Sequence, residues 1–247
     1  LAPNSDNFCT TPQATGFGAV YYLESVMKHE HDTLEGKTVA VAGFGNVAWG
    51  VVQKLSELGA KPVTLSGPDG YIYDPDGITT KEKFDFMLEM RASGRNKVQD
   101  YADKFGCKFV AGDKPWGEKV DIIMPCATQN DVDLTQAKRI VANNIKYYIE
   151  VANMPTTNEA LRFLMDQKNM VVAPSKAVNA GGVLVSALEM SQNSEVDDKL
   201  HQIMTEIHDG SAECAEKYGL GYNLVAGANM VGFQKVADAM MAQGIAW

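Results

Sequence analysis

The feature that most constrains the fold is a glycine-rich hexapeptide, Gly43-Phe44-Gly45-Asn46-Val47-Ala48. It follows residues 37–42 (KTVAVA), a run without charge after its first position, which is typical of a buried parallel strand. A helical pattern follows it up to about residue 58, where Gly59 is suited to end the helix. In such a G-x-G-x-x-A turn the first glycine permits the bend, the second lets a diphosphate approach the backbone, and the alanine packs the helix closely. The pattern therefore predicts dinucleotide binding at the start of a helix; the alternative is a turn with a structural role only.

The rest of the chain alternates strands with helices. Strand-like runs occupy residues 61–65, 121–124, 146–150 and 170–173, and helical stretches occupy residues 11–28, 81–90, 133–142 and 157–167. Residues 66–78 are rich in turn formers, and the chain is mostly helical from residue 178 to about 243. This alternation predicts an α/β fold, a Rossmann-like, doubly wound and mostly parallel sheet with flanking helices. We expect residues 1–247 to form a single dinucleotide-binding domain, with the helices from about residue 178 packed on it.

Charge and cysteine usage exclude several classes of function. With 22 basic and 31 acidic residues the net charge is −9, which repels phosphate backbones and argues against nucleic acid as a partner. No apolar run approaches the roughly 20 residues of a membrane span, and the first residues do not resemble a signal peptide. The cysteines, Cys9, Cys107, Cys126 and Cys214, form no C-x-x-C pair. We therefore expect free thiols, no metal site and a cytoplasmic location.

The residues after the second strand bear on the choice of dinucleotide. NAD-binding folds place an acidic residue there to hydrogen-bond the adenosine ribose, and the segment Ser66-Gly67-Pro68-Asp69 offers Asp69. No Arg or Lys lies between Ser66 and Asp76 to neutralise the 2′-phosphate of NADP. This segment predicts NAD as the cofactor, with NADP as the alternative. Asp69 could also be an ordinary turn residue.

Six short motifs follow one another from about residue 14 to the C-terminus. They are Ala14-Thr15-Gly16-Phe17-Gly18, Gly43 to Ala48, Pro125-Cys126-Ala127-Thr128-Gln129-Asn130, Ala152-Asn153-Met154-Pro155-Thr156-Thr157, Asn179-Ala180-Gly181-Gly182-Val183 and Gly227-Ala228-Asn229. Together, and in this order, they resemble the coenzyme-binding domain of the hexameric glutamate dehydrogenases, within the wider glutamate/leucine/phenylalanine/valine dehydrogenase family.

The resemblance implies a role for individual residues. Thr15 and Asn46 would contact the nicotinamide and phosphate parts of the cofactor, and Ala127, Thr128 and Asn153 would line the wall beside the nicotinamide ribose. Asn179, Gly182, Val183 and Ser186 would lie at the edge of the cleft, with Ser186 binding the substrate γ-carboxylate. Asn153 could instead close a turn, and Ser186 could be a small helix-packing residue.

The resemblance also implies a reaction that this chain would not complete by itself. The family oxidises L-glutamate to 2-oxoglutarate and ammonia with a catalytic lysine and aspartate of a substrate domain, and nothing in this sequence resembles that domain. A polar insertion usual in the family is also missing around Ser194 to Val196. We expect an inactive piece, a monomer or weak dimer, of a homohexameric enzyme. The alternatives are an enzyme for leucine, valine or phenylalanine, or a binding module without catalysis.

Overall fold

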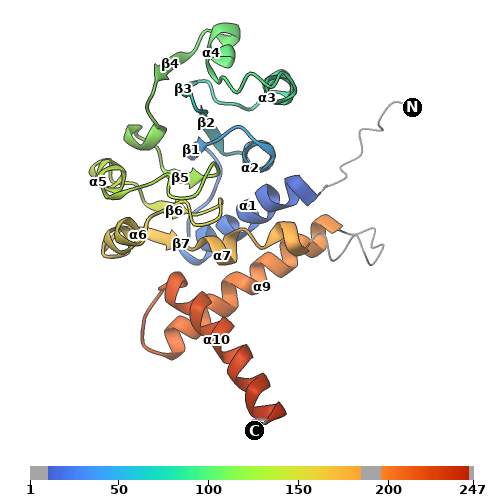
Figure 1. Cartoon of the computed structure of the whole chain (residues 1–247). Helices are drawn as coiled ribbons and strands as arrows, with labels where there is room; N and C mark the ends of the chain where they lie inside the picture. The colour runs from blue at the N-terminus through green and yellow to red at the C-terminus, as the bar shows by residue number, and fades with distance from the viewer. Residues whose placement is uncertain (1–10, 185–195, 245–247) are drawn as a thin grey trace.

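The computed structural model describes residues 11–184 and 196–244, which are built around a seven-stranded sheet (Figure 1). The strands are β1 (Thr38–Ala42), β2 (Lys61–Ser66), β3 (Gly70–Tyr73), β4 (Lys108–Ala111), β5 (Ile122–Pro125), β6 (Tyr147–Ile149) and β7 (Val171–Ala173). Their spatial order is β4-β3-β2-β1-β5-β6-β7. Strands β1, β2, β5, β6 and β7 are parallel, whereas β3 is antiparallel to both of its neighbours. Strands β2 to β4 lie on one side of β1, and β5 to β7, which follow them in the sequence, lie on the other side. The strand order therefore reverses between β1 and β5.

Helices cover both faces of the sheet because the buried side chains of β1 alternate between two cores. Val39 and Val41 belong to the core under α1 (Thr11–His29), α2 (Asn46–Glu57), α3 (Lys81–Ala92) and α4 (Gln99–Phe105). Ala40 and Ala42 belong to the core under α5 (Leu134–Ala142), α6 (Asn158–Met165) and the short 3₁₀-helix η1 (Pro115–Gly117). Figure 1 shows the two groups of helices on opposite sides of the strands. Such burial on both faces is what the uncharged β1 sequence predicts.

Two glycines hold the start of α1 against the segments that follow β1 and β7. A Cβ atom on Gly16 would lie 2.5 Å from the carbonyl oxygen of Val47, in the first turn of α2. A Cβ atom on Gly181 would lie 2.4 Å from the carbonyl oxygen of Ala14. Side chains at these two positions would force the segments apart, so the close approach of three backbones depends on glycine.

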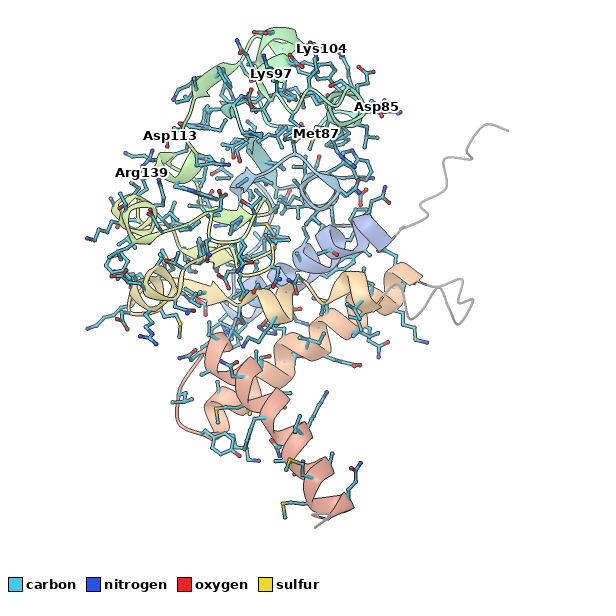
Figure 2. All side chains as sticks on the ribbon, viewed as in Figure 1. Asp85, Met87, Lys97, Lys104, Asp113 and Arg139 are labelled. Carbon is cyan, nitrogen blue, oxygen red and sulfur yellow. The ribbon has the colours of Figure 1, made fainter. Side chains whose placement is uncertain are left out.

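An ion pair fixes the loop after β4 to the helix α5. The guanidinium of Arg139 donates two hydrogen bonds of 2.8 Å to the carboxylate of Asp113, and the two residues lie side by side in Figure 2. This bidentate contact holds the pKa of Asp113 below its usual range. The pair thereby stabilises the connection that carries the chain from the β4 edge back to β5.

The expected fold class is confirmed, and most of the expected elements are present within a residue or two of their predicted bounds. Thr80 caps the start of α3, since its hydroxyl oxygen accepts a hydrogen bond from the backbone N–H of Lys83. Within the turn-rich residues 66–78, residues 70–73 form the strand β3, which was not predicted. The predictions also lacked β4 and α4, each of seven residues or fewer.

The chain ends in two long helices, α9 (Val196–Lys217) and α10 (Leu224–Gln243), which follow the short α7 (Ser175–Val178). Leu200 and Met204 of α9 are buried in the core beside α1. Leu224 and Gly227 at the start of α10 are buried, and the rest of the helix projects away from the body of the molecule (Figure 1). Its distal part exposes large apolar side chains, with Phe233 74% and Met240 61% exposed. In the described part of the chain, no helix is both long and apolar enough to cross a membrane.

Candidate functional site

The residues predicted from the glycine turn lie at the carboxyl ends of β1 and β2. Gly43 has a φ of +98°, a conformation that favours glycine, and its backbone N–H donates a 2.9 Å hydrogen bond to the hydroxyl of Ser66 at the end of β2. On its other side, a Cβ atom at Gly43 would lie 3.2 Å from the carbonyl oxygen of Cys126 and 3.3 Å from Ala127. The turn is therefore held from both neighbouring strands, β2 and β5. This is the point where the strand order reverses, which is where open α/β sheets bind ligands.

The start of α2 is open to a ligand. Gly45 precedes the helix, no side chain caps it, and a Cβ atom at Gly45 would meet no protein atom within 4 Å. The first N–H groups of a helix need partners and carry partial positive charge, so this end favours an anion. A cation that the sequence did not predict lies beside it, because the Arg91 guanidinium at the end of α3 donates a hydrogen bond to the side-chain oxygen of Asn46. The geometry and charge therefore fit a phosphate or diphosphate at this corner.

The carboxylate of Asp69 is hydrogen-bonded within the protein. Its two carboxylate oxygens accept hydrogen bonds of 3.1 Å from the backbone N–H groups of Val98 and Gln99, where α4 begins. Pro68 beside it is exposed, and the neighbouring Phe44 ring is buried against Gly67. Each oxygen of an ionised carboxylate can accept more than one hydrogen bond, so this contact leaves acceptor capacity for a ribose hydroxyl.

Loops after β5 and β6 form the other half of the site edge. Ala127 and Thr128 follow β5, and Asn153 follows β6 on an exposed turn. The turn is joined to the β5 loop by backbone hydrogen bonds, including Asn130 N–H to the Met154 carbonyl at 3.0 Å. The structure therefore places these three predicted residues along one edge, on adjoining loops.

The remaining predicted residues lie where α1 meets the segment after β7. Thr15 is next to Gly16 in the close crossing with α2, and Asn179 ends the short helix α7. Gly182 and Val183 follow the contact between Gly181 and α1, and Val183 is 76% exposed. Ser186 lies outside the described residues.

A buried acid at the end of β6 was not predicted. Glu150 is only 3% exposed, and its carboxylate accepts a 3.0 Å hydrogen bond from the backbone N–H of Ser175, the first residue of α7. Burial raises the pKa of Glu150, although hydrogen bonds from Thr156 and Ser175 and the charge of Lys176 act against this rise. No local sequence pattern distinguishes a glutamate such as Glu150 after a strand. Arg91, the other site residue that was not predicted, is distant in sequence from the glycine turn that it reaches.

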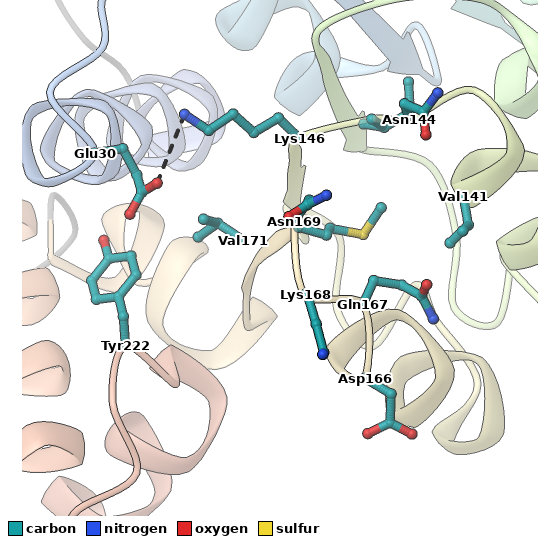
Figure 3. Close-up of a pocket in the computed structure, with 12 residues that line it drawn as sticks. Glu30, Val141, Asn144, Lys146, Asp166, Gln167, Lys168, Asn169, Val171 and Tyr222 are labelled. Atoms are coloured by element: carbon teal, nitrogen blue, oxygen red, sulfur yellow. Dashed lines mark ion pairs between the residues drawn. The ribbon is translucent and has the colours of Figure 1, made fainter.

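A large cavity lies away from this edge. Its volume is about 970 Å³, and Lys146, Lys168 and Tyr222 are among the residues that line it (Figure 3). Residues 144–146 and 166–170 of its wall immediately precede β6 and β7, so it opens at the amino ends of these strands. The glycine turn is at the opposite, carboxyl end of the sheet. Within the described ranges, no group of three or more His, Cys, Asp or Glu side chains is arranged to hold a metal ion.

Comparison with known proteins gives consistent matches over nearly the whole chain. Residues 9–244 match the sequence profile of the glutamate/leucine/phenylalanine/valine dehydrogenases. The NAD-specific glutamate dehydrogenase of Clostridium symbiosum is 81% identical over 96% of this chain and 54% of its own length. The NADP-specific glutamate dehydrogenase of Escherichia coli is 46% identical over 95% of this chain and 54% of its own length. A solved glutamate dehydrogenase with 81% identity superposes with a TM-score of 0.93, over 96% of this chain and 54% of that one. The chain thus spans about half the length of the relatives it matches.

Proposed function

The chain belongs to the glutamate/leucine/phenylalanine/valine dehydrogenase family, and from this premise we propose that it is the dinucleotide-binding part of an NAD-linked glutamate dehydrogenase. The observation that carries the proposal is the turn at Gly43, fixed between the ends of β2 and β5 and leading into the uncapped start of α2. The relative with 81% identity is named NAD-specific, whereas the NADP-specific one is 46% identical, which supports NAD. The reaction of the whole enzyme is the oxidative deamination of L-glutamate to 2-oxoglutarate and ammonia.

Each part of the cofactor has residues that suit it. Backbone N–H groups at the start of α2 bind the diphosphate, and Arg91 adds positive charge beside Asn46. Asp69 accepts a hydrogen bond from the adenosine ribose. The residues assigned to the cofactor are Thr15, Gly43, Phe44, Gly45, Asn46, Val47, Ser66, Pro68, Asp69, Ala127, Thr128, Asn153 and Asn179, and those facing substrate are Gly182, Val183 and Ser186. When bound, the nicotinamide supplies the hydride acceptor, and this chain binds and orients it.

We assign the proton transfers to a substrate domain outside this chain, so the chain alone should not turn over glutamate. The relatives are nearly twice as long as this chain, which leaves room for such a domain. The exposed stripe of Phe233, Val236, Met240 and Met241 on α10 offers it an apolar face, since side chains at this spacing lie on one side of a helix. We further propose that the whole enzyme is a homohexamer and that this piece alone is a monomer or weak dimer.

A cytoplasmic location is proposed from the thiols. Cys107, Cys126 and Cys214 are free, and the last two are buried. Proteins of oxidising compartments more often pair their cysteines.

Titration of this chain with NADH and NADPH tests the proposal, with the fluorescence of Trp49 and Trp116 as the signal. Trp49 lies in the first turn of α2, where its backbone N–H bonds the carbonyl of Gly45 at 2.9 Å, so it is well placed to report on a ligand at this corner. We expect saturable binding that is tighter for NADH. Tighter binding of NADPH would favour an NADP-linked enzyme, and no binding of either would refute the proposal.

A second experiment mixes the chain with a separately produced substrate domain, which should restore glutamate oxidation. A chain that binds NADH but gives no glutamate oxidation in this mixture would be a non-catalytic module.

A further inference from the structure

Glu150 occupies an unusual position at the carboxyl end of β6. Buried carboxylates are rare unless their oxygens are hydrogen-bonded, because removal of the charge from water is unfavourable. Glu150 is 3% exposed, and the backbone N–H of Ser175 donates a 3.0 Å hydrogen bond to its carboxylate, while the nearby Thr156 hydroxyl limits the rise of its pKa. An apolar side chain could be buried at this position with a smaller loss of hydration free energy, so the acid and its hydrogen-bond partner call for a functional explanation.

Thr156 is hydrogen-bonded to another buried side chain of the same region. Its hydroxyl and the hydroxyl of Tyr148, which is fully buried, lie 2.7 Å apart, and either can donate to the other. Glu150 receives the backbone N–H of Ser175. Two buried polar contacts therefore lie at the carboxyl end of β6.

These contacts lie among the three loops that carry one side of the proposed cofactor site. Thr156 lies after Asn153 in the β6 loop and forms a bridge with Val132 in the β5 loop, which carries Ala127 and Thr128. Ser175 begins α7, and its carbonyl accepts the backbone N–H of Asn179 at 2.9 Å. Glu150 therefore joins the end of β6 to α7 through its side chain, and Thr156 joins the β6 loop to Tyr148 of β6 and to the β5 loop.

We propose that Glu150 and Thr156 are positioning residues that hold the loops after β5, β6 and β7 in register and so shape the side of the site that receives the nicotinamide and its ribose. The inference rests on the proposed function, since it assigns these loops to that half of the cofactor. Neither side chain needs to touch the cofactor. Its adenosine and diphosphate half, at the glycine turn and Asp69, does not depend on this network.

The test compares NADH with ADP, which lacks the nicotinamide and its ribose. In the full 247-residue chain, Glu150→Ala and Thr156→Val should each weaken NADH binding roughly tenfold, the scale of one buried group left without its hydrogen-bond partner. Both variants should bind ADP within about twofold of the parent. The fluorescence of bound NADH, which reports on the nicotinamide environment, should fall in both. Glu150→Gln should recover most of the affinity, because its amide oxygen can still accept the hydrogen bond from the Ser175 N–H.

Asp121→Ala is the matched control. The Asp121 carboxylate also accepts a backbone N–H, from Thr38 at 2.8 Å, but at the amino ends of β1 and β5. This variant should lower the melting temperature without changing the ratio of NADH to ADP affinity. Unchanged NADH binding in folded Thr156→Val would overturn the proposal, and so would an equal loss of NADH and ADP affinity in both variants. A parent chain that binds neither ligand would instead show that the proposed function itself is wrong.

Discussion

The hydrogen bond between Ser66 and Gly43 allows a sharp test of how the glycine turn is held. The substitution Ser66→Ala removes only the hydroxyl that accepts the Gly43 N–H at 2.9 Å. Both residues are buried, with Ser66 1% exposed, so water cannot replace the lost acceptor without rearrangement. A buried donor left without a partner costs about 1–3 kcal/mol, whereas the cavity left by one hydroxyl adds little. We therefore expect the free energy of unfolding, measured by urea denaturation, to fall by about 1–3 kcal/mol.

The same substitution should weaken ADP binding severalfold, because the turn would then be joined to the end of β2 by the longer, 3.4 Å hydrogen bond from the Ser66 backbone N–H to the Gly43 carbonyl. Thr64→Val is the matched control on the same strand, since the buried Thr64 hydroxyl donates a 2.9 Å hydrogen bond to the carbonyl of Val41. It should lower stability by about 1 kcal/mol and leave ADP affinity unchanged. If Ser66→Ala changes neither stability nor ADP binding, the turn does not depend on Ser66. If Thr64→Val weakens ADP binding equally, general loosening of the sheet explains the effect.

Three further variants test other parts of the molecule. Gly45→Val should leave the melting temperature nearly unchanged, since a Cβ atom there meets no protein atom within 4 Å, but should abolish ADP binding measured by calorimetry; retained binding would place the phosphates elsewhere. Burial lowers the pKa of His208 from its ordinary 6.5, so the unfolded chain binds the extra proton and stability should decline as pH falls below about 6.5. His208→Gln, which can still bond Asp209 and Tyr222, should flatten that part of the curve in urea denaturations at several pH values, and an unchanged slope would exclude His208 as its source. Phe233→Ser with Met240→Ser should leave NADH binding intact but reduce recovery of glutamate oxidation with a separately produced substrate domain, and full recovery would show that the α10 stripe does not meet that domain.

The sequence predicts the parallel part of the fold well because its strands are buried on both faces. A run such as residues 38–42, which carries no charge and is followed by a glycine turn, is compatible with few structures other than a buried parallel strand. The antiparallel edge is different. β3 consists of Gly70–Tyr73 between two turn-forming segments, and its pairing with β4 joins residues about 40 positions apart, such as Gly70 and Ala111. No local pattern of four residues specifies such a partner, so the strand is recognisable only once the sheet exists.

The site likewise contains residues that the sequence predicts and residues that it does not. Residues in the glycine turn follow directly from the sequence, because their backbone conformation requires particular residue types. Arg91 follows β2 by 25 positions and reaches Asn46 only because α3 returns along α2. The absence of Arg and Lys between Ser66 and Asp76 therefore does not make this corner free of cations. Asp69 likewise caps α4, a helix that the sequence did not predict.

The two halves of the edge are stabilised by different means, and this difference has a functional consequence. The half at β1 and β2 depends on a glycine conformation and on a backbone N–H bound by Ser66. The half at β5, β6 and β7 depends on the buried contacts of Glu150 with Ser175 and of Thr156 with Tyr148. A dinucleotide laid across the switch point between β1 and β5 would contact both halves. The backbone joins the halves through the Cys126 N–H and the Ala42 carbonyl at 3.0 Å, but the side-chain hydrogen bonds that stabilise each half involve different residues. Substitutions of these side chains in one half should therefore act on one end of the cofactor, and their effects should add when combined.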